Sequence, residues 1–200
     1  MKKSAITAPV DRRSLRTRSA LSQALIGLIA ERSWDEIAVQ DICERANIGR
    51  STFYLHYPNK DALLQGGLDG LHAELQRQAL VRAADAEPHP VALVGFKFAL
   101  GLIEHAFEQR KVFRSLIGRR SGYVVQLRFR EMVIRLITDE LPASTGRIPR
   151  VAVARWLAGA FVELLGWWIE QSTPLPPEDL LVVFNELSRP ALDQTRGSFS

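Results

Sequence analysis

Residues 49–60 read GRSTFYLHYPNK, and this short stretch decides how the rest of the chain is interpreted. It places three aromatic residues, a histidine and several hydrogen-bonding or charged groups within barely two helical turns. A helix inside a core needs an apolar stripe and little else. Pro58 ends this helix, and Asn59 is a good N-cap for the next one. The stretch is therefore predicted to contact something charged outside the protein.

The residues on either side of this stretch predict further helices. One helix is predicted over 17–32, because apolar residues recur at helical spacing, at Leu21, Ala24, Leu25, Leu28 and Ile29. A short helix is predicted over 39–46, with Ile42 and Ala46 inward, and Asn47 then tolerates the left-handed conformation of a sharp turn. Helices over 50–57 and 59–84 follow. Two short helices joined by a tight turn and braced by a longer one form a helix-turn-helix.

In a helix-turn-helix, the second helix enters the major groove of DNA and its N-terminal residues reach base edges. Phe53 and Tyr57 are expected to face inward with Ile48. The outward residues then divide by chemistry. Arg50 can donate two parallel bonds to guanine, Ser51 and Thr52 can donate or accept, and Tyr54, His56 and Lys60 are suited to phosphates.

Each outward residue also has a plain structural interpretation. Tyr54 could be a half-buried core aromatic, His56 could cap a helix or pack, and Lys60 could be a solvated lysine. Arg50 could pair with Glu44 or Asp41.

The segment EIAVQDICERANIGRSTFYLHYPNKDALL, residues 36–64, resembles the DNA-binding module of the tetracycline-repressor (TetR) family of bacterial transcription regulators. The resemblance covers about residues 13–70 and is carried by Ile42, Ala46, Ile48, Thr52, Phe53, Tyr54, His56, Tyr57, Lys60 and Leu63. It implies DNA contacts at Gln40, Arg50, Ser51, Thr52, Tyr54, His56 and Lys60. Two departures stand out: Ala38 and Val39 replace a hydroxyl cap, and Gly49 lies where a serine cap is frequent.

Composition limits the class of protein. The chain has 200 residues, of which 46% are hydrophobic and 24% charged, as in a globular protein with a core. The single cysteine, Cys43, excludes a disulfide framework within the chain and suits a reducing cytoplasm. The sequence shows neither a secretory signal nor an apolar run of the roughly 20 residues that span a bilayer. Basic residues cluster in 1–20 and 110–135, where a phosphate-binding face and a merely solvated face both remain open.

The rest of the chain is also predicted to be helical, over 91–109, 111–118, 122–141, 149–172 and 177–188. No segment alternates as a strand, so the fold is predicted to be all-α. The expected domains are 13–73 for DNA binding and 74–193 for ligand binding and dimerisation, with flexible tails at 1–12 and 194–200. The four histidines and one cysteine fall at no metal-ligand spacing, and no catalytic constellation or phosphate loop is visible. Neither a cofactor nor an enzymatic activity is expected.

The helix over 150–172 is apolar nearly all round, with small residues every seven positions at Ala152, Gly159 and Gly166. The resemblance implies that it pairs with the helix at 177–188 and with their copies in a four-helix dimer interface. The expected interface residues are Ala152, Gly159, Glu163, Gly166, Leu180, Phe184 and Leu187. A central core helix of a monomer is the alternative.

A pocket for an aromatic or lipophilic small molecule is expected between these helices. Its candidate lining residues are Phe98, Leu102, His105, Tyr123, Phe129, Met132, Trp156, Phe161 and Trp168. Aromatics at helical spacing are also typical of ordinary core. These features predict a cytoplasmic, homodimeric DNA-binding regulator that binds a palindromic operator and responds to the ligand. That it is a repressor, released by the ligand, is implied only by the resemblance to the TetR family. The alternative is an activator or architectural DNA-binding protein without an effector.

Overall fold

The computed structural model of this 200-residue chain describes residues 12–85, 95–117, 122–142 and 148–195. Within these ranges every regular element is a helix, and the all-α prediction is confirmed. The basic segment before residue 12, the residues Arg119 and Arg120, and most of both predicted tails lie outside the described residues.

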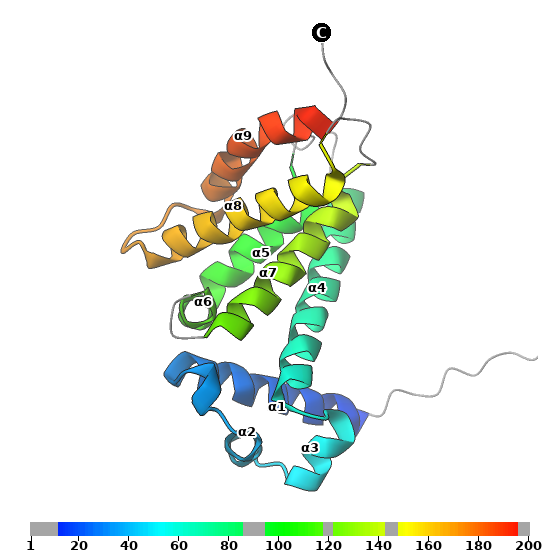
Figure 1. Ribbon diagram of the computed structural model, residues 1–200, viewed down its shortest axis with the longest axis vertical. Helices are drawn as coiled ribbons and strands as arrows, with labels where there is room; N and C mark the ends of the chain where they lie inside the picture. Colours follow the sequence, from blue (N-terminus) through cyan, green and yellow to red (C-terminus); the bar gives the residue numbers. More distant parts are fainter. Residues whose placement is uncertain (1–11, 86–94, 118–121, 143–147, 196–200) are drawn as a thin grey trace, which may run out of the picture.

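Three helices form a small module at one end of the molecule (Figure 1). They are α1 (Arg12–Glu31), α2 (Val39–Ala46) and α3 (Arg50–His56), with the short 3-10 helix η1 (Trp34–Glu36) between the first two. The predicted stripe of α1 is buried and packs with Ile42 of α2 and Phe53 of α3, both of which are 0% exposed. This module is the predicted helix-turn-helix.

Helix α4 (Lys60–Asp85) rises from this module into the larger body (Figure 1). It begins where predicted, because the Asn59 side chain caps it by accepting a hydrogen bond from the Ala62 amide at 2.8 Å. It also runs unbroken through residues 73 and 74, where the sequence predicted a domain boundary. A single helix therefore connects the two parts of the molecule.

The body consists of α5 (Lys97–Glu108), α6 (Arg110–Ile117), α7 (Tyr123–Glu140), α8 (Arg150–Glu170) and α9 (Pro177–Thr195). The prediction placed the start of α5 too early. Phe96 is its N-cap, and the Glu140 carboxylate accepts the amides of Lys97 at 2.6 Å and Phe98 at 3.1 Å. A carboxylate on a distant helix thus supplies the cap that the local sequence lacks.

Helix α9 extends past its predicted end at residue 188, through Pro190, to Thr195. Proline removes one helical hydrogen bond and crowds the preceding turn. Here the turn after Pro190 carries Leu192, which is 7% exposed and belongs to the core. Burial of that side chain offsets the loss at the proline.

Helix α8 is long and apolar enough to cross a membrane by length and composition alone, with a mean hydropathy of 1.3 in its best window. The sequence prediction, which found no such run, missed this. Half of that window is buried inside the molecule, where the helix packs against α6, α7 and α9. A core helix of a soluble protein passes the same test, so this is weak evidence for a membrane span.

Candidate nucleic-acid interface and effector cavity

The turn between α2 and α3 depends on Asn47, which adopts the left-handed conformation with φ 52° and ψ 46°. Its amide donates to the Glu44 carbonyl at 3.1 Å, and the amide of Ile48 donates to the Cys43 carbonyl at 2.9 Å. These bonds close the end of α2, and the chain then enters α3 at Gly49 in an extended conformation. The predicted turn residue therefore sets the angle between the two helices.

Helix α2 is held by charged side chains rather than by a hydroxyl cap. Its N-cap is Ala38, whose amide donates to the Asp41 carboxylate at 2.7 Å. Arg45 donates to both carboxylate oxygens of Glu31 on α1, at 2.8 Å and 2.6 Å. This bidentate pair lowers the pKa of the Glu31 carboxyl, chiefly through the hydrogen bond from Arg45. The position of α2 against α1 is thus fixed despite the missing hydroxyl.

Helix α3 has two distinct faces. Phe53 is fully buried and lies edge-on to Tyr54 with ring centroids 5.4 Å apart, while Tyr57 packs partly buried against the core. On the other face, Arg50 and Ser51 are exposed and Tyr54 is half-exposed. Thr52 and His56 are partly exposed between the two faces. The polar side chains that the sequence assigned to DNA are therefore at the surface.

Arg50 is an exposed residue at the start of α3. The two carboxylates proposed as its alternative partners are engaged elsewhere: Asp41 pairs with Arg32 at 3.4 Å, and Glu44 accepts a hydrogen bond from exposed Gln40 at 2.8 Å. Among the described residues no ion pair to the Arg50 guanidinium is found. A guanidinium at the start of an exposed helix can donate its fork of N–H groups to a base edge.

The structure gives Lys60 a role inside the protein. Its ammonium donates to the carbonyl oxygens of Trp34 at 2.7 Å and Ile37 at 2.8 Å, and lies 4.6 Å from the centroid of the Trp34 ring. The sequence offered two interpretations, a phosphate contact or a solvated lysine, and the structure shows a third. Lys60 fastens the start of α4 to the loop between α1 and α2.

One residue of α3 that the sequence reasoning passed over is Leu55, which is 83% exposed. It lies one turn after Ser51 on the outward face. The sequence could have identified Leu55, because this leucine lies outside the apolar stripe of its helix. In the major groove, an apolar side chain at such a position contacts thymine methyl groups.

The predicted ligand-pocket residues do not share one cavity. His105 and Phe129 line an apolar cavity of about 330 Å³, the seam cavity, together with Ser22, Leu25, Ile26, Leu63, Leu64, Gly67, Leu68, Gly70, Leu71, Glu74, Val112, Phe113 and Leu116. Five others are packed in the core of the body: Phe98, Leu102, Met132, Phe161 and Trp168. Tyr123 and Trp156 are instead 77% and 58% exposed. Core packing accounts for the five buried residues, as in the edge-on pair of Phe98 and Phe161 at 5.9 Å.

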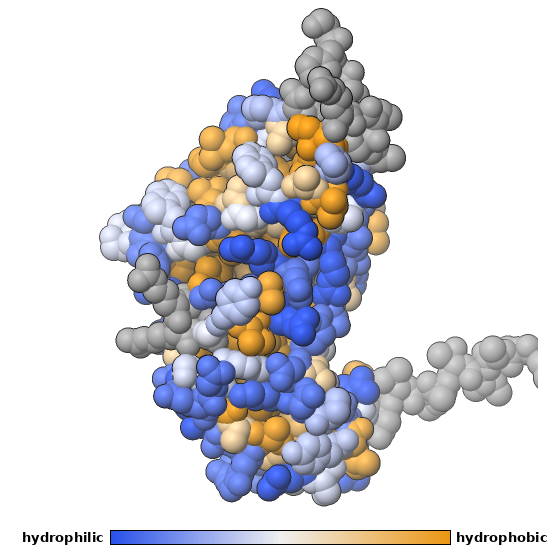
Figure 2. Space-filling view, viewed as in Figure 1, coloured by the Kyte–Doolittle hydropathy of each residue, from blue (hydrophilic) through white to orange (hydrophobic). Residues whose placement is uncertain are grey.

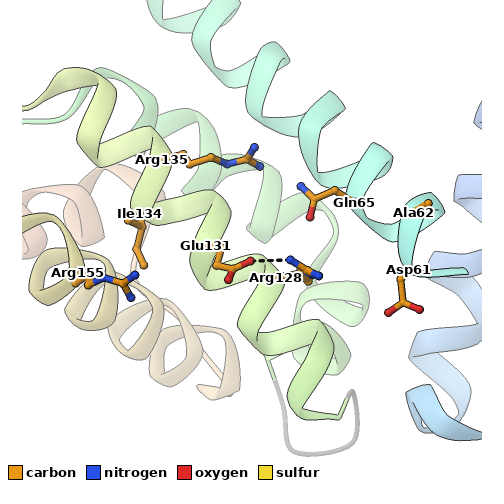
Figure 3. A pocket seen from close by; sticks show the side chains of 8 residues that line it. All are labelled: Asp61, Ala62, Gln65, Arg128, Glu131, Ile134, Arg135 and Arg155. Atoms are coloured by element: carbon orange, nitrogen blue, oxygen red, sulfur yellow. Dashed lines mark hydrogen bonds and ion pairs between the residues drawn. The ribbon is translucent and has the colours of Figure 1, made fainter. Parts of the chain in front are cut away.

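A second hollow lies between α4 and α7 and is lined by charged side chains (Figure 3). Asp61 and Gln65 of α4 face Arg128, Glu131 and Arg135 of α7, with Arg155 of α8 beyond. Arg128 pairs with Glu131 at 3.1 Å, and Arg135 pairs with Asp69 at 2.7 Å. Because its charges are largely paired and it is open to solvent, this hollow is a weaker candidate for a lipophilic ligand than the seam cavity.

The expected interface residues fall into two groups. Ala152, Glu163 and Leu187 are exposed, and a side chain added at Gly159 would meet open space. Leu180 and Phe184 are 1% and 2% exposed, because they pack into the chain's own core. The ring centroids of Phe184 and Phe161 lie 4.9 Å apart there. Gly166 is covered by Ile117 of α6, which would lie 3.2 Å from an added Cβ. The small-residue track therefore packs against the chain's own α6 at Gly166 and faces open space at Gly159.

The exposed side of α8 and α9 nevertheless carries large apolar residues, namely Val151, Trp156, Trp167, Val182 and Leu187. Trp156 also lines a shallow apolar hollow with Ile148, Ala152, Val153 and Ala191. Figure 2 shows hydrophobic surface at this end of the molecule, where the start of α8 lies near the end of α9. We call this surface the outer α8–α9 face.

The helix-turn-helix is also found by comparison with known proteins. Residues 22–66, which include the α2–α3 turn and the start of α4, match the profile described as bacterial regulatory proteins, tetR family. The chain belongs to the TetR family. Residues 22–66 thus carry the helix-turn-helix of this family of bacterial regulatory proteins.

Individual relatives agree with this assignment. An uncharacterized HTH-type transcriptional regulator of Bacillus subtilis (strain 168), YxbF, is 43% identical over 174 residues, which are 86% of this chain and 44% of that protein. The chain thus spans less than half the length of this relative. A TetR transcriptional regulator from Streptococcus agalactiae 2603V is 27% identical, with a TM-score of 0.61 over 90% of this chain and 97% of that one.

The fold extends to more distant TetR structures. NalD, the secondary repressor of the MexAB-OprM multidrug efflux pump in Pseudomonas aeruginosa, is 16% identical with a TM-score of 0.59. The alignment covers 90% of this chain and 96% of NalD. At this identity the likeness concerns the fold alone, and it includes the helical body as well as the DNA-binding module.

Proposed function

We propose that this TetR-family chain is a homodimeric repressor that binds a palindromic operator through α3 and is released by a small lipophilic molecule. The observation that carries the DNA-binding part is the division of α3 into a buried face and a polar outer face, where Arg50 has no ion pair to any residue that the structure describes. A regulator that acts on DNA in this way works in the cytoplasm.

The proposed contacts divide into two kinds. Arg50, Ser51, Thr52 and Leu55 are placed to reach base edges, because they lie on or beside the outward face of α3. Gln40, Tyr54 and His56 are proposed to contact phosphates. Lys60 is left out of this set, since its ammonium is bound to two backbone carbonyls.

Dimerisation is proposed to use the outer α8–α9 face. Exposed apolar residues gathered on one surface are typical of a protein interface. Two-fold pairing would present two copies of α3 to half-sites about 34 Å apart, one turn of DNA, and so multiply the weak contacts of one module.

The effector is proposed to act through α4, the helix that both parts of the molecule share. A ligand shifts the DNA-binding equilibrium only if it binds one arrangement of the two parts more tightly than the other. An apolar cavity at the junction of these parts provides for such a preference.

The experiment that tests the DNA-binding proposal is selection of duplexes from a random pool, followed by the same selection with Arg50→Ala. We expect the variant to relax the preference at one base pair per half-site, with a loss of about 1–3 kcal/mol for the preferred duplex and little change for others. Circular dichroism would confirm that the variant is folded. Equal weakening on all duplexes would show that Arg50 contacts phosphate, and the absence of any preferred duplex for the wild type would overturn the proposal.

A further inference from the structure

The seam cavity lies between the DNA-binding module and the body. Ser22, Leu25 and Ile26 of α1 form one wall, and Val112, Phe113 and Leu116 of α6 form another. The first half of α4 connects the two. A molecule in this cavity would touch both parts of the protein at once. Its volume of about 330 Å³ lies at the small end of the range of ligand pockets.

Two glycines keep this cavity open. Helix α4 contains Gly66, Gly67 and Gly70, although glycine weakens a helix interior. Gly66 has a packing reason, because an added Cβ would lie 3.1 Å from the Tyr57 ring. Gly67 and Gly70 have none: an added Cβ would meet nothing within 4 Å, and both residues line the cavity. The cavity is therefore open beside Gly67 and Gly70 because these two residues have no side chains.

One end of the cavity is polar. Leu71, Glu74 and His105 also line an adjoining cleft of about 290 Å³. The other residues of this cleft include Gln78, Arg82, Glu104 and Glu108. The cleft thus contains three carboxylates, at residues 74, 104 and 108, and one guanidinium, at residue 82.

The pairing of these charges leaves a net negative end. Arg82 pairs with Glu104, and Arg77 pairs with Glu74 at 2.6 Å, so two of the three carboxylates have a counter-ion. The hydrogen bonds from Arg77 and Gln78 lower the pKa of the Glu74 carboxyl to about 2. Among the described residues no hydrogen bond or ion pair to the Glu108 carboxylate is found. Burial lowers the pKa of the half-buried His105, while the nearby Glu108 carboxylate opposes this shift, and the net lowering favours the neutral imidazole. Within the described ranges, the Glu108 carboxylate is thus the charge of this cleft that has no counter-ion, and it favours a cation over an anion.

We propose that the seam cavity and its adjoining cleft together bind a compact lipophilic amine. The apolar body lies beside Gly67 and Gly70, and the ammonium points to Glu108. His105 lines both compartments, so a ring nitrogen of its imidazole can accept a hydrogen bond from the ammonium. An alcohol of the same shape would lose the charge attraction, and a carboxylate would be repelled.

The regulatory consequence rests on the proposed function. Because the bound amine contacts α1, α4 and α6, its occupancy favours one orientation of the DNA-binding module over others. The amine is then the effector whose binding lowers DNA affinity.

The test uses three probes of one shape: 1-naphthylmethylamine, 1-naphthalenemethanol and 1-naphthoate. Isothermal titration with the full-length chain should give the amine at least about tenfold tighter binding than the alcohol, and no saturable binding of the carboxylate. Gly67→Leu fills the cavity and should abolish amine binding. Glu108→Gln should weaken the amine and leave the alcohol unchanged. Glu170→Gln, at the exposed end of α8, is the matched control and should bind as the wild type does.

Two outcomes would overturn the inference. Equal or tighter binding of the alcohol or carboxylate would exclude the amine, and amine binding retained in Gly67→Leu would place the probe elsewhere. If Gly67→Leu does not fold, the double variant Gly67→Ala, Gly70→Ala takes its place, with binding expected to weaken. Duplex binding by the ligand-free wild type is measured separately. A failure of the proposed DNA binding can therefore be distinguished from a failure of amine binding. Amine binding that leaves duplex affinity unchanged would overturn the regulatory consequence.

Discussion

At the scale of single residues, Lys60 shows how a side chain changes role when its surroundings are known. Beside the polar residues of α3, a lysine is most readily interpreted as a phosphate contact. The structure instead ties its ammonium to carbonyls 23 and 26 residues earlier in the chain. Both carbonyls lie in the segment between α1 and α2. By binding them, Lys60 stabilises the DNA-binding module, which also contains α3.

Replacing Lys60 tests this role directly. Lys60→Ala removes two charge-assisted hydrogen bonds and should lower the free energy of unfolding by about 1–3 kcal/mol. Urea denaturation measures the loss, with exposed Lys111→Ala as the control that should change little. The salt dependence of DNA binding should stay the same. A slope reduced by about one, without loss of stability, would make Lys60 a phosphate contact after all.

Leu55 is predicted to read a thymine methyl group. Leu55→Ala should weaken the preferred duplex by about 1–2 kcal/mol, the value expected for burying its missing carbons. Replacing the contacted thymine by uracil should weaken wild-type binding similarly, because uracil lacks the methyl group. The same replacement should hardly affect Leu55→Ala. Independent, additive losses in a binding titration would show that the two groups do not touch.

At the scale of elements, α4 combines two requirements that its sequence had to reconcile. Its first turn must hold the DNA-binding module, through Asn59 and Lys60. Its second and third turns carry glycines that weaken the helix, one to admit Tyr57 and two beside an open space. The start of α4 is therefore held by hydrogen bonds to the DNA-binding module, whereas its glycines leave space for the cavity further along the helix.

The three glycines of α4 should respond differently to alanine. Gly67→Ala should raise the free energy of unfolding by about 0.5–1 kcal/mol, because alanine is a better helix former and its Cβ meets nothing. Gly66→Ala is the matched control, since its Cβ would lie 3.1 Å from the Tyr57 ring and cancel that gain. Thermal unfolding of both variants measures the difference. A larger gain at residue 66 would contradict the packing described for Tyr57.

At the scale of the whole molecule, the outer α8–α9 face is the surface that most needs a partner. Several large apolar side chains share it, including Trp156 and Leu187. The same helix, α8, also packs against α6 and α7 on its inner side. An all-round apolar helix is thus explained by burial within the chain on one side and a proposed dimer contact on the other.

Charge placed on this face should separate the dimer. Trp156→Glu is expected to weaken self-association by about 2 kcal/mol or more, roughly 30-fold in Kd, as for an aromatic anchor of an interface. Sedimentation equilibrium measures this change. Tyr123→Glu is the control, because Tyr123 is an exposed aromatic at the start of α7. Equal effects of the two variants, or a wild type that stays monomeric, would rule out this interface.

The helix-turn-helix could be predicted from the sequence because its signals are local. The stripe of α1, the left-handed Asn47, the stop at Pro58 and the cap at Asn59 each act within a few residues. Such signals do not depend on how distant segments pack. The outward polar face of α3 followed from them as soon as Phe53 was placed inward.

What the tertiary structure decided were the contacts between segments far apart in the chain. The periodicity of α8 could not separate buried Phe161 and Trp168 from exposed Trp156, because apolar residues surround that helix. The partners of Lys60 and the walls of the seam cavity come from different helices. Local sequence determines which helices form and how they turn. Burial of one helix against another determines which side chains are left for a ligand or a second subunit.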